Sequence, residues 1–135
     1  MKIRIISSRE EINSIRPNEK AVHMSFRASN VDFLNLIKKA PRLQMVQVPP
    51  SYMKTMSESN EVFLEMQGVK LLEGDVWGHR KDIDEYFTVP DQALEAIKSM
   101  KKEGLASDDI AKEVQKTTKL GKELVKYLAK AEIAA

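Results

Sequence analysis

The spacing of the β-type segments constrains this chain more than any other feature of its sequence. Apolar and β-branched residues gather in short runs at 2–6, 21–26, 43–48 and 69–72, which begin about 20 to 26 residues apart with helical patterns between them. Strands and helices that alternate at this period predict parallel strands joined by right-handed crossovers. We therefore expect residues 1–87 to form an α/β unit with a small four-stranded parallel sheet, of the flavodoxin-like or half-Rossmann βαβ type.

The three connectors carry recognisable helix signals. Ser8 and Glu11 form a capping-box pattern at the start of the first connector, and Ser29 is a natural N-cap for the second. The third extends over 51–67 and either breaks or starts late at the polar stretch 57–60, with Gly68 suited to the position after its end. Leucine-rich repeats share this period. We prefer the open sheet because the third connector is long and no asparagine or cysteine recurs at the turns.

Composition excludes several classes of protein. The 135 residues can bury one modest core or an α/β unit with a helical appendage. Cysteine is absent, which removes disulfides, thiolate metal sites and cysteine nucleophiles. With 22 basic and 20 acidic residues, no strong overall field points to a partner. No apolar run approaches the roughly 20 residues of a membrane helix, and no signal peptide is recognised, so we expect a cytoplasmic protein without a membrane partner.

A change of composition near residue 88 predicts a second unit, a helical segment over 88–135. Its portion 107–130 resembles a helix-turn-helix: 110–114 matches the first helix, and 124–128 resembles the end of a recognition helix. Gln115 and Lys116 depart from the usual turn, and the segment has no arginine. Lysines dominate its last part, and such a strip is suited to phosphates. We expect contacts with nucleic acid or a protein partner from Lys119, Lys122 and Lys126.

Polar residues follow the ends of the predicted strands and should meet at one edge of the sheet, where α/β proteins bind ligands. Arginines, hydroxyl groups and helix-start N–H groups suit a small anion. No Walker loop or Gly-x-Gly-x-x-Gly sequence is present, so no cofactor is predicted. The expected ligand-binding residues are Arg27, Ser29, Ser51, Tyr52, Asp75, Trp77, His79 and Arg80.

The two histidines have different expected roles. His79 could act as a general acid or base oriented by Asp75, four residues earlier, although no nucleophile is spaced to complete a triad. In the alternative interpretation Trp77 fills a domain interface and His79 lies in solvent. His23 alternates with apolar residues in a strand and is expected in the core or at a contact with a partner, and not as a ligand. Two histidines so far apart provide no metal-site spacing, and no metal is predicted.

Three strings in this chain resemble those of a known family. They are 36–44 (LIKKAPRLQ), 48–52 (VPPSY) and 74–83 (GDVWGHRKDI), and the region 21–89 that contains them is similar to a family of uncharacterised small proteins of methanogenic archaea, a domain of unknown function. This resemblance implies an archaeal, cytoplasmic origin and no assigned activity. Separately, 40–46 looks like a helix-to-strand junction of D-2-hydroxyacid dehydrogenases, which supports the parallel sheet by analogy only.

The leading functional hypothesis is a non-enzymatic regulatory module. Its α/β unit would bind a small anionic ligand at the sheet edge, and its helical segment would contact nucleic acid or a protein partner. Two alternatives stay open. One is a small enzyme that uses His79, and the other is an assembly subunit that forms a homodimer through a free sheet edge or the helical segment.

Overall fold

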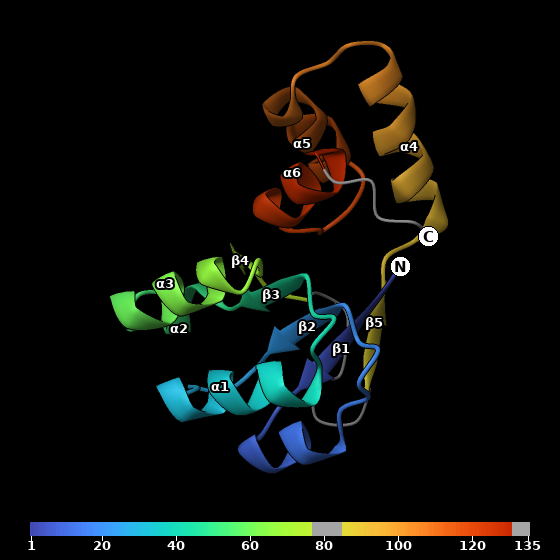
Figure 1. Cartoon of the computed structure of the whole chain (residues 1–135). Helices are drawn as coiled ribbons and strands as arrows, with labels where there is room; N and C mark the ends of the chain where they lie inside the picture. Colours follow the sequence, from blue (N-terminus) through green and yellow to red (C-terminus); the bar gives the residue numbers. More distant parts are fainter. Residues whose placement is uncertain (77–84, 131–135) are drawn as a thin grey trace.

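The structure, a computed structural model, describes residues 1–76 and 85–130 (Figure 1). A sheet lies between two layers of helices. The elements in chain order are β1 (Lys2–Ile6), the 3₁₀ helix η1 (Arg9–Ser14), β2 (Ala21–Met24), α1 (Asn30–Lys39), β3 (Met45–Val48), α2 (Pro50–Met53), α3 (Glu58–Met66), β4 (Lys70–Glu73), β5 (Tyr86–Thr88), α4 (Asp91–Lys102), α5 (Ser107–Gln115) and α6 (Lys122–Lys130).

The strand order in the sheet is β4-β3-β2-β1-β5. The pairs β1–β2, β2–β3 and β3–β4 are parallel, which confirms the predicted parallel arrangement of these strands. The predicted count of four was wrong, because β5 adds a fifth strand antiparallel to β1, with Ile3 opposite Phe87. β5 has only three residues, so it shows no periodicity of its own. It forms because the outer edge of β1 offers unpaired backbone groups.

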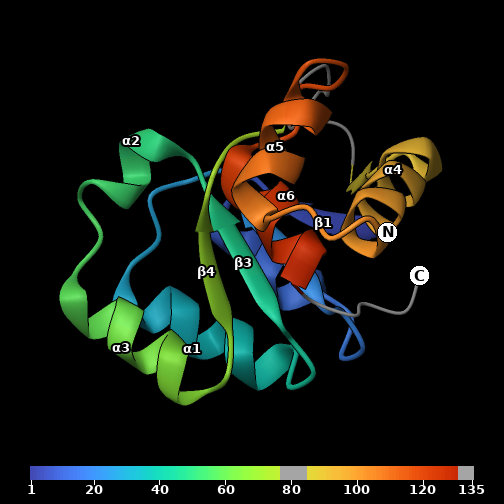
Figure 2. The ribbon, with the colours of Figure 1, turned by 90° about the horizontal axis from the view of Figure 1, so that it is seen from above.

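Helices cover both faces of the sheet. One face carries η1, α1 and α3, and the other carries α4, α5 and α6 (Figures 1 and 2). Right-handed crossovers between strands in sequential order place all their helices on one face, so the C-terminal helices cover the apolar face that would otherwise meet water. Met24, Val46 and Val48 pack under the first layer. Ile3, Ala21 and Met45 pack under the second.

The connectors differ in detail from the predicted helices. The first is the 3₁₀ helix η1, in which Ser8 makes no side-chain cap; Glu11 instead accepts a hydrogen bond from the backbone N–H of Ser7. The third divides into α2 and α3, and Ser57 caps α3 by accepting from the N–H of Asn60. Gly68 has a φ of 74°, as its predicted position after the helix requires.

The order of the strands also bears on where a ligand can bind. In doubly wound folds a crevice opens where the strand order reverses. Here β1 to β4 follow one another without reversal, which matches the half-Rossmann alternative and not the flavodoxin-like order. Strands β1 to β4 therefore supply no crevice of the kind that a reversal of strand order creates. In the described residues no helix is long and apolar enough to cross a membrane.

Candidate functional site

Two of the predicted ligand-binding residues meet at the carboxyl edge of the sheet. The Arg27 guanidinium lies 5.6 Å from the centre of the Tyr52 ring, and its Nη1 donates to Thr55 Oγ1 at 2.8 Å. Arg27 is exposed and Tyr52 half-buried. The cavity beside them holds only about 20 Å³, the room for one water molecule. Any anion at Arg27 would therefore lie on the surface.

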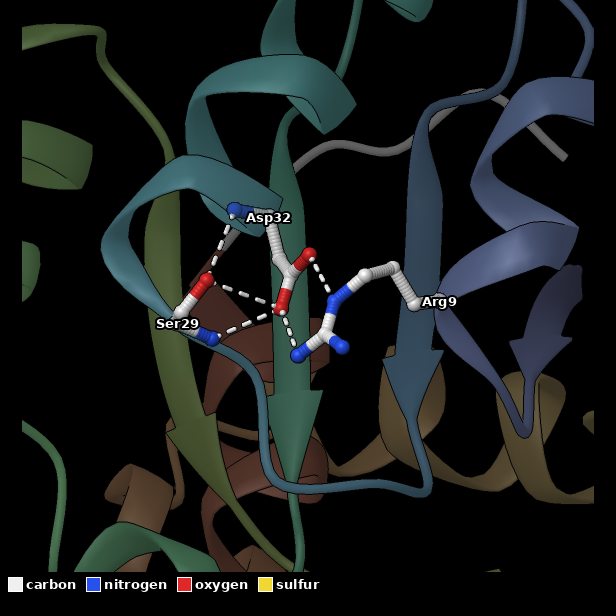
Figure 3. A network of polar contacts seen from close by, with 3 residues as sticks. All are labelled: Arg9, Ser29 and Asp32. Carbon is white, nitrogen blue, oxygen red and sulfur yellow. Dashed lines mark hydrogen bonds and ion pairs between the residues drawn. The ribbon is translucent and has the colours of Figure 1, made fainter.

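Ser29 caps α1, and the structure shows what satisfies this helix start (Figure 3). Its Oγ accepts from the N–H of Asp32, while the Asp32 carboxylate accepts from the Ser29 N–H at 2.8 Å. Arg9 adds two hydrogen bonds to that carboxylate, at 2.7 and 3.1 Å. Burial by itself raises the pKa of Asp32, but the hydrogen bonds from Arg9 and Ser29 outweigh it and hold the pKa below its usual value. The carboxylate of Asp32 thus occupies the start of α1, the place where the predicted anionic ligand would bind at Ser29.

Ser51 directly precedes Tyr52 in α2, whereas Asp75 lies beside His23. Ser51 is exposed in α2, whose four residues provide little helix dipole. Asp75 follows β4 on the side toward the C-terminal helices, and its Oδ1 lies 3.5 Å from Nε2 of His23. His23 is fully buried, as predicted, and its Nδ1 lies 2.8 Å from Gln47 Oε1. Asp75 therefore contacts a buried polar pair beneath the helical layer.

Trp77, His79 and Arg80 lie outside the described residues, so their predicted roles in binding, and that of His79 in acid–base catalysis, stay predictions. Within residues 1–76 and 85–130, no group of three or more histidine, aspartate or glutamate side chains could hold a metal ion.

The C-terminal helices form a compact unit around buried Ile110, Val114 and Leu124. Side-chain hydrogen bonds stabilise the turn between α5 and α6, although Gln115 stands where this turn usually has glycine. Thr118 Oγ1 donates to the carbonyl of Val114 at 2.9 Å, and Gln115 Nε2 donates to the carbonyl of Leu120 at 3.3 Å. These side chains close the turn where the sequence departs from the usual pattern.

The three lysines that are predicted to contact nucleic acid or a partner lie in α6 or in the turn before it. Lys119 and Lys122 are exposed, in the turn and at the start of α6. Lys126 is half-buried, and its Nζ lies 2.8 Å from Asp108 Oδ1, an ion pair that lowers the pKa of Asp108 through the hydrogen bond and the charge of Lys126. A phosphate at Lys126 would have to compete with Asp108.

A groove of about 400 Å³ lies between α6 and the edge strand β4. Glu123, in the first turn of α6, is one of its lining residues, and its Oε1 accepts from the backbone N–H of Glu73 at 3.1 Å. Burial raises the pKa of Tyr127, which lines the groove. Among the residues that the structure describes, the groove is lined by Lys70, Leu71, Leu72, Glu123, Lys126, Tyr127 and Lys130.

The fold and these surfaces define an α/β protein with a C-terminal helix-turn-helix unit. Residues 2–85 match the N-terminal domain of a family of unknown function, DUF1699, and residues 92–130 match the C-terminal HTH domain of the same family. The chain belongs to this family. The match confirms the predicted helix-turn-helix and the predicted resemblance to a family of unknown function. No curated protein and no solved structure matches the chain.

The sequence did not predict that β4 lines the groove beside α6. Lys70 and Glu123 are 53 positions apart in the sequence numbering, and nothing local signals that they line one groove. The available signal was the abundance of apolar residues in both faces of the strands at 43–48 and 69–72, which indicated that a second layer must cover the sheet.

Proposed function

We propose that this chain is a non-enzymatic regulatory protein whose helix-turn-helix unit binds duplex DNA. The observation that carries the proposal is the row of lysines on α6: Lys122, Lys126 and Lys130 recur every four residues and so share one side of the helix. Exposed Lys119 extends this row into the turn. An HTH domain with cations on the outer side of its last helix is suited to phosphate contacts.

The residue types favour contacts with the DNA backbone over reading of bases. Residues 91–130 contain no arginine, the side chain best shaped to bind guanine through two hydrogen bonds. Lysine instead neutralises phosphates as a point charge. We therefore expect strong salt dependence and modest sequence preference.

The α/β unit is the proposed site of control. A small anionic ligand would bind at the exposed Arg27 and pack on Tyr52, with Ser51 nearby in sequence. Gln47 is buried next to Gly121, just before α6, and half-buried Asp75 lies beside His23, which contacts Gln47. These contacts support a route by which changes at this edge reach the HTH unit. A cytoplasmic location, an archaeal source, a domain boundary near residue 88 and a homodimer stay predictions.

Fluorescence anisotropy of a labelled duplex of roughly 20 base pairs, two helical turns, tests the DNA proposal. We expect Lys119→Gln and Lys122→Gln each to weaken binding about three- to tenfold and to reduce the slope of log K against log salt by about 1. Lys39→Gln is the matched control, because Lys39 is exposed at the end of α1 on the opposite face of the sheet.

Absence of binding by the unmodified chain at low salt would contradict the proposal. Equal losses in Lys39→Gln would also contradict it, since overall charge and not the α6 surface would then explain the affinity.

A further inference from the structure

The edge strand β4 lies beside the side of α6 that carries Lys126 and Lys130. Glu123 ties the first turn of the helix to the β4 backbone, and Tyr127 and Lys130 follow along the same groove. Lys70 faces them from the first position of β4 and is exposed. The groove therefore has one wall from each of the two units that match the family's domains.

The charges on the two walls are suited to an anionic chain. At a rise of about 1.5 Å per residue, lysines four positions apart are roughly 6 Å apart along α6. Lys130 and Lys70 have no carboxylate partner among the described residues, so both are available to an incoming phosphate. Glu123 is the one acidic residue among the described residues of the lining, and its carboxylate accepts a hydrogen bond from the N–H of Glu73.

From this arrangement we infer that duplex DNA binds across α6 and β4 together, with a phosphate strand in the groove between them and Lys70 as a contact contributed by the α/β unit. This inference rests on the proposed function and adds a residue outside the helix-turn-helix to it. The buried side of α6, with Leu124, Val125 and Leu128, is fixed to the helices and the sheet. In α6, Lys122 and Lys130 are exposed, so the lysine side of the helix, next to the groove with β4, is available to DNA.

The same geometry argues against deep insertion of α6 into a major groove in this docked arrangement. A helix that enters the major groove must project from its protein, because the groove is only about 12 Å wide. Here the hydrogen bond from Glu73 to Glu123 keeps the sheet beside the first turn of α6. A phosphate strand alongside the helix fits this surface, whereas full insertion requires that β4 separate from α6.

The test uses the full chain and the same labelled duplex, with Lys70→Gln and the matched control Lys39→Gln. We expect Lys70→Gln to weaken binding about three- to tenfold and to lower the salt slope by about 1, with an unchanged melting temperature. Lys39→Gln should bind as the unmodified chain does. If Lys122→Gln loses affinity and Lys70→Gln does not, the inference fails and the proposed function stands. If the unmodified chain does not bind, both fail.

Two variants of Glu123 distinguish whether β4 contributes to DNA binding or obstructs the access of DNA to α6. Glu123→Gln keeps an oxygen that can accept from Glu73 and removes a negative charge, so we expect it to bind about two- to fivefold more tightly. Glu123→Ala also removes the charge but loses the tie to β4. If the inference is correct, Glu123→Ala binds the duplex no more tightly than Glu123→Gln does. Binding by Glu123→Ala at least about tenfold tighter than by Glu123→Gln would overturn the inference, because β4 would then obstruct α6.

Discussion

At the scale of single residues, Gly74 shows how closely the chain packs against β3 where it leaves β4. A Cβ added at Gly74 would lie 2.6 Å from Gln47 Nε2 and 3.4 Å from its Cδ. Gln47 is fully buried and its Oε1 contacts His23, so its side chain has little freedom to move aside. The absence of a side chain at Gly74 is therefore required by packing, at the point where the chain leaves β4 for Asp75.

We expect Gly74→Ala to lower the free energy of unfolding by about 1–3 kcal/mol, the usual range for overpacking. Gly121→Ala is the control, since a Cβ there would lie 3.6 Å from the same Nε2, an ordinary contact. The free energy of unfolding of Gly121→Ala should fall by less than about 1 kcal/mol, the usual effect of alanine at a helix start. Urea denaturation measures both. Equal losses in the two variants would show that the contact with Gln47 does not limit position 74.

At the scale of elements, one ion pair joins η1 to α1. Arg9 lies in η1 and its side chain is 61% exposed, whereas the Asp32 carboxylate in α1 is 2% exposed. The pair spans 23 positions of sequence and also completes the cap of α1 with Ser29. A buried carboxylate held by several donors contributes more than a surface ion pair does, although the exposure of Arg9 reduces the effect.

This pair should make the stability depend on pH. The folded pKa of Asp32 lies below its ordinary value of 3.8, so its contribution is complete above about that pH and is lost as the pH falls through the folded pKa. We expect Asp32→Asn to cost about 1–2 kcal/mol at neutral pH and less at a pH of about 3. Urea denaturation at both pH values measures the difference. A loss that is the same at both would contradict the assigned charge interaction.

At the scale of the whole molecule, the helical unit and the sheet share one apolar cluster. Ile3, Ala21 and Met45 from the sheet meet Leu124 and Val125 from α6. The face of the sheet that carries them would be exposed without the C-terminal helices. We infer that the two units that match the family's domains stabilise each other and unfold together.

Leu124→Ala tests this coupling. Removal of a buried leucine side chain should cost about 2–5 kcal/mol, and hydrogen exchange should then show lower protection in β2 and β3 as well as in α5. Leu34→Ala, at a site 40% exposed on α1, is the control and should change stability by less than about 0.5 kcal/mol. Full protection of the strands in Leu124→Ala, with loss confined to the helices, would show two independent units.

Local patterns predicted the elements best where a residue acts on its own neighbours. Ser29 caps α1 and Gly68 follows α3 as expected, because caps and positive φ angles are decided within a few residues. The predicted cap at Ser8 failed since the connector closes as a 3₁₀ helix and Ser7 reaches Glu11 instead. Of the expected ligand site, the structure unites Arg27 with Tyr52. Ser29 is committed to Asp32, and Asp75 lies near His23.

Local patterns along the chain were enough to predict the alternation of strands and helices, the parallel pairing of β1 to β4 and the helix-turn-helix, because periodicity and caps are local properties. Three arrangements could be seen only in the folded chain: β5 pairs with the outer edge of β1, the helical unit covers the second face of the sheet, and Lys70 lies across a groove from Lys130. These arrangements depend on contacts between residues far apart in sequence, where burial of a shared apolar face, and not local preference, selects the partner.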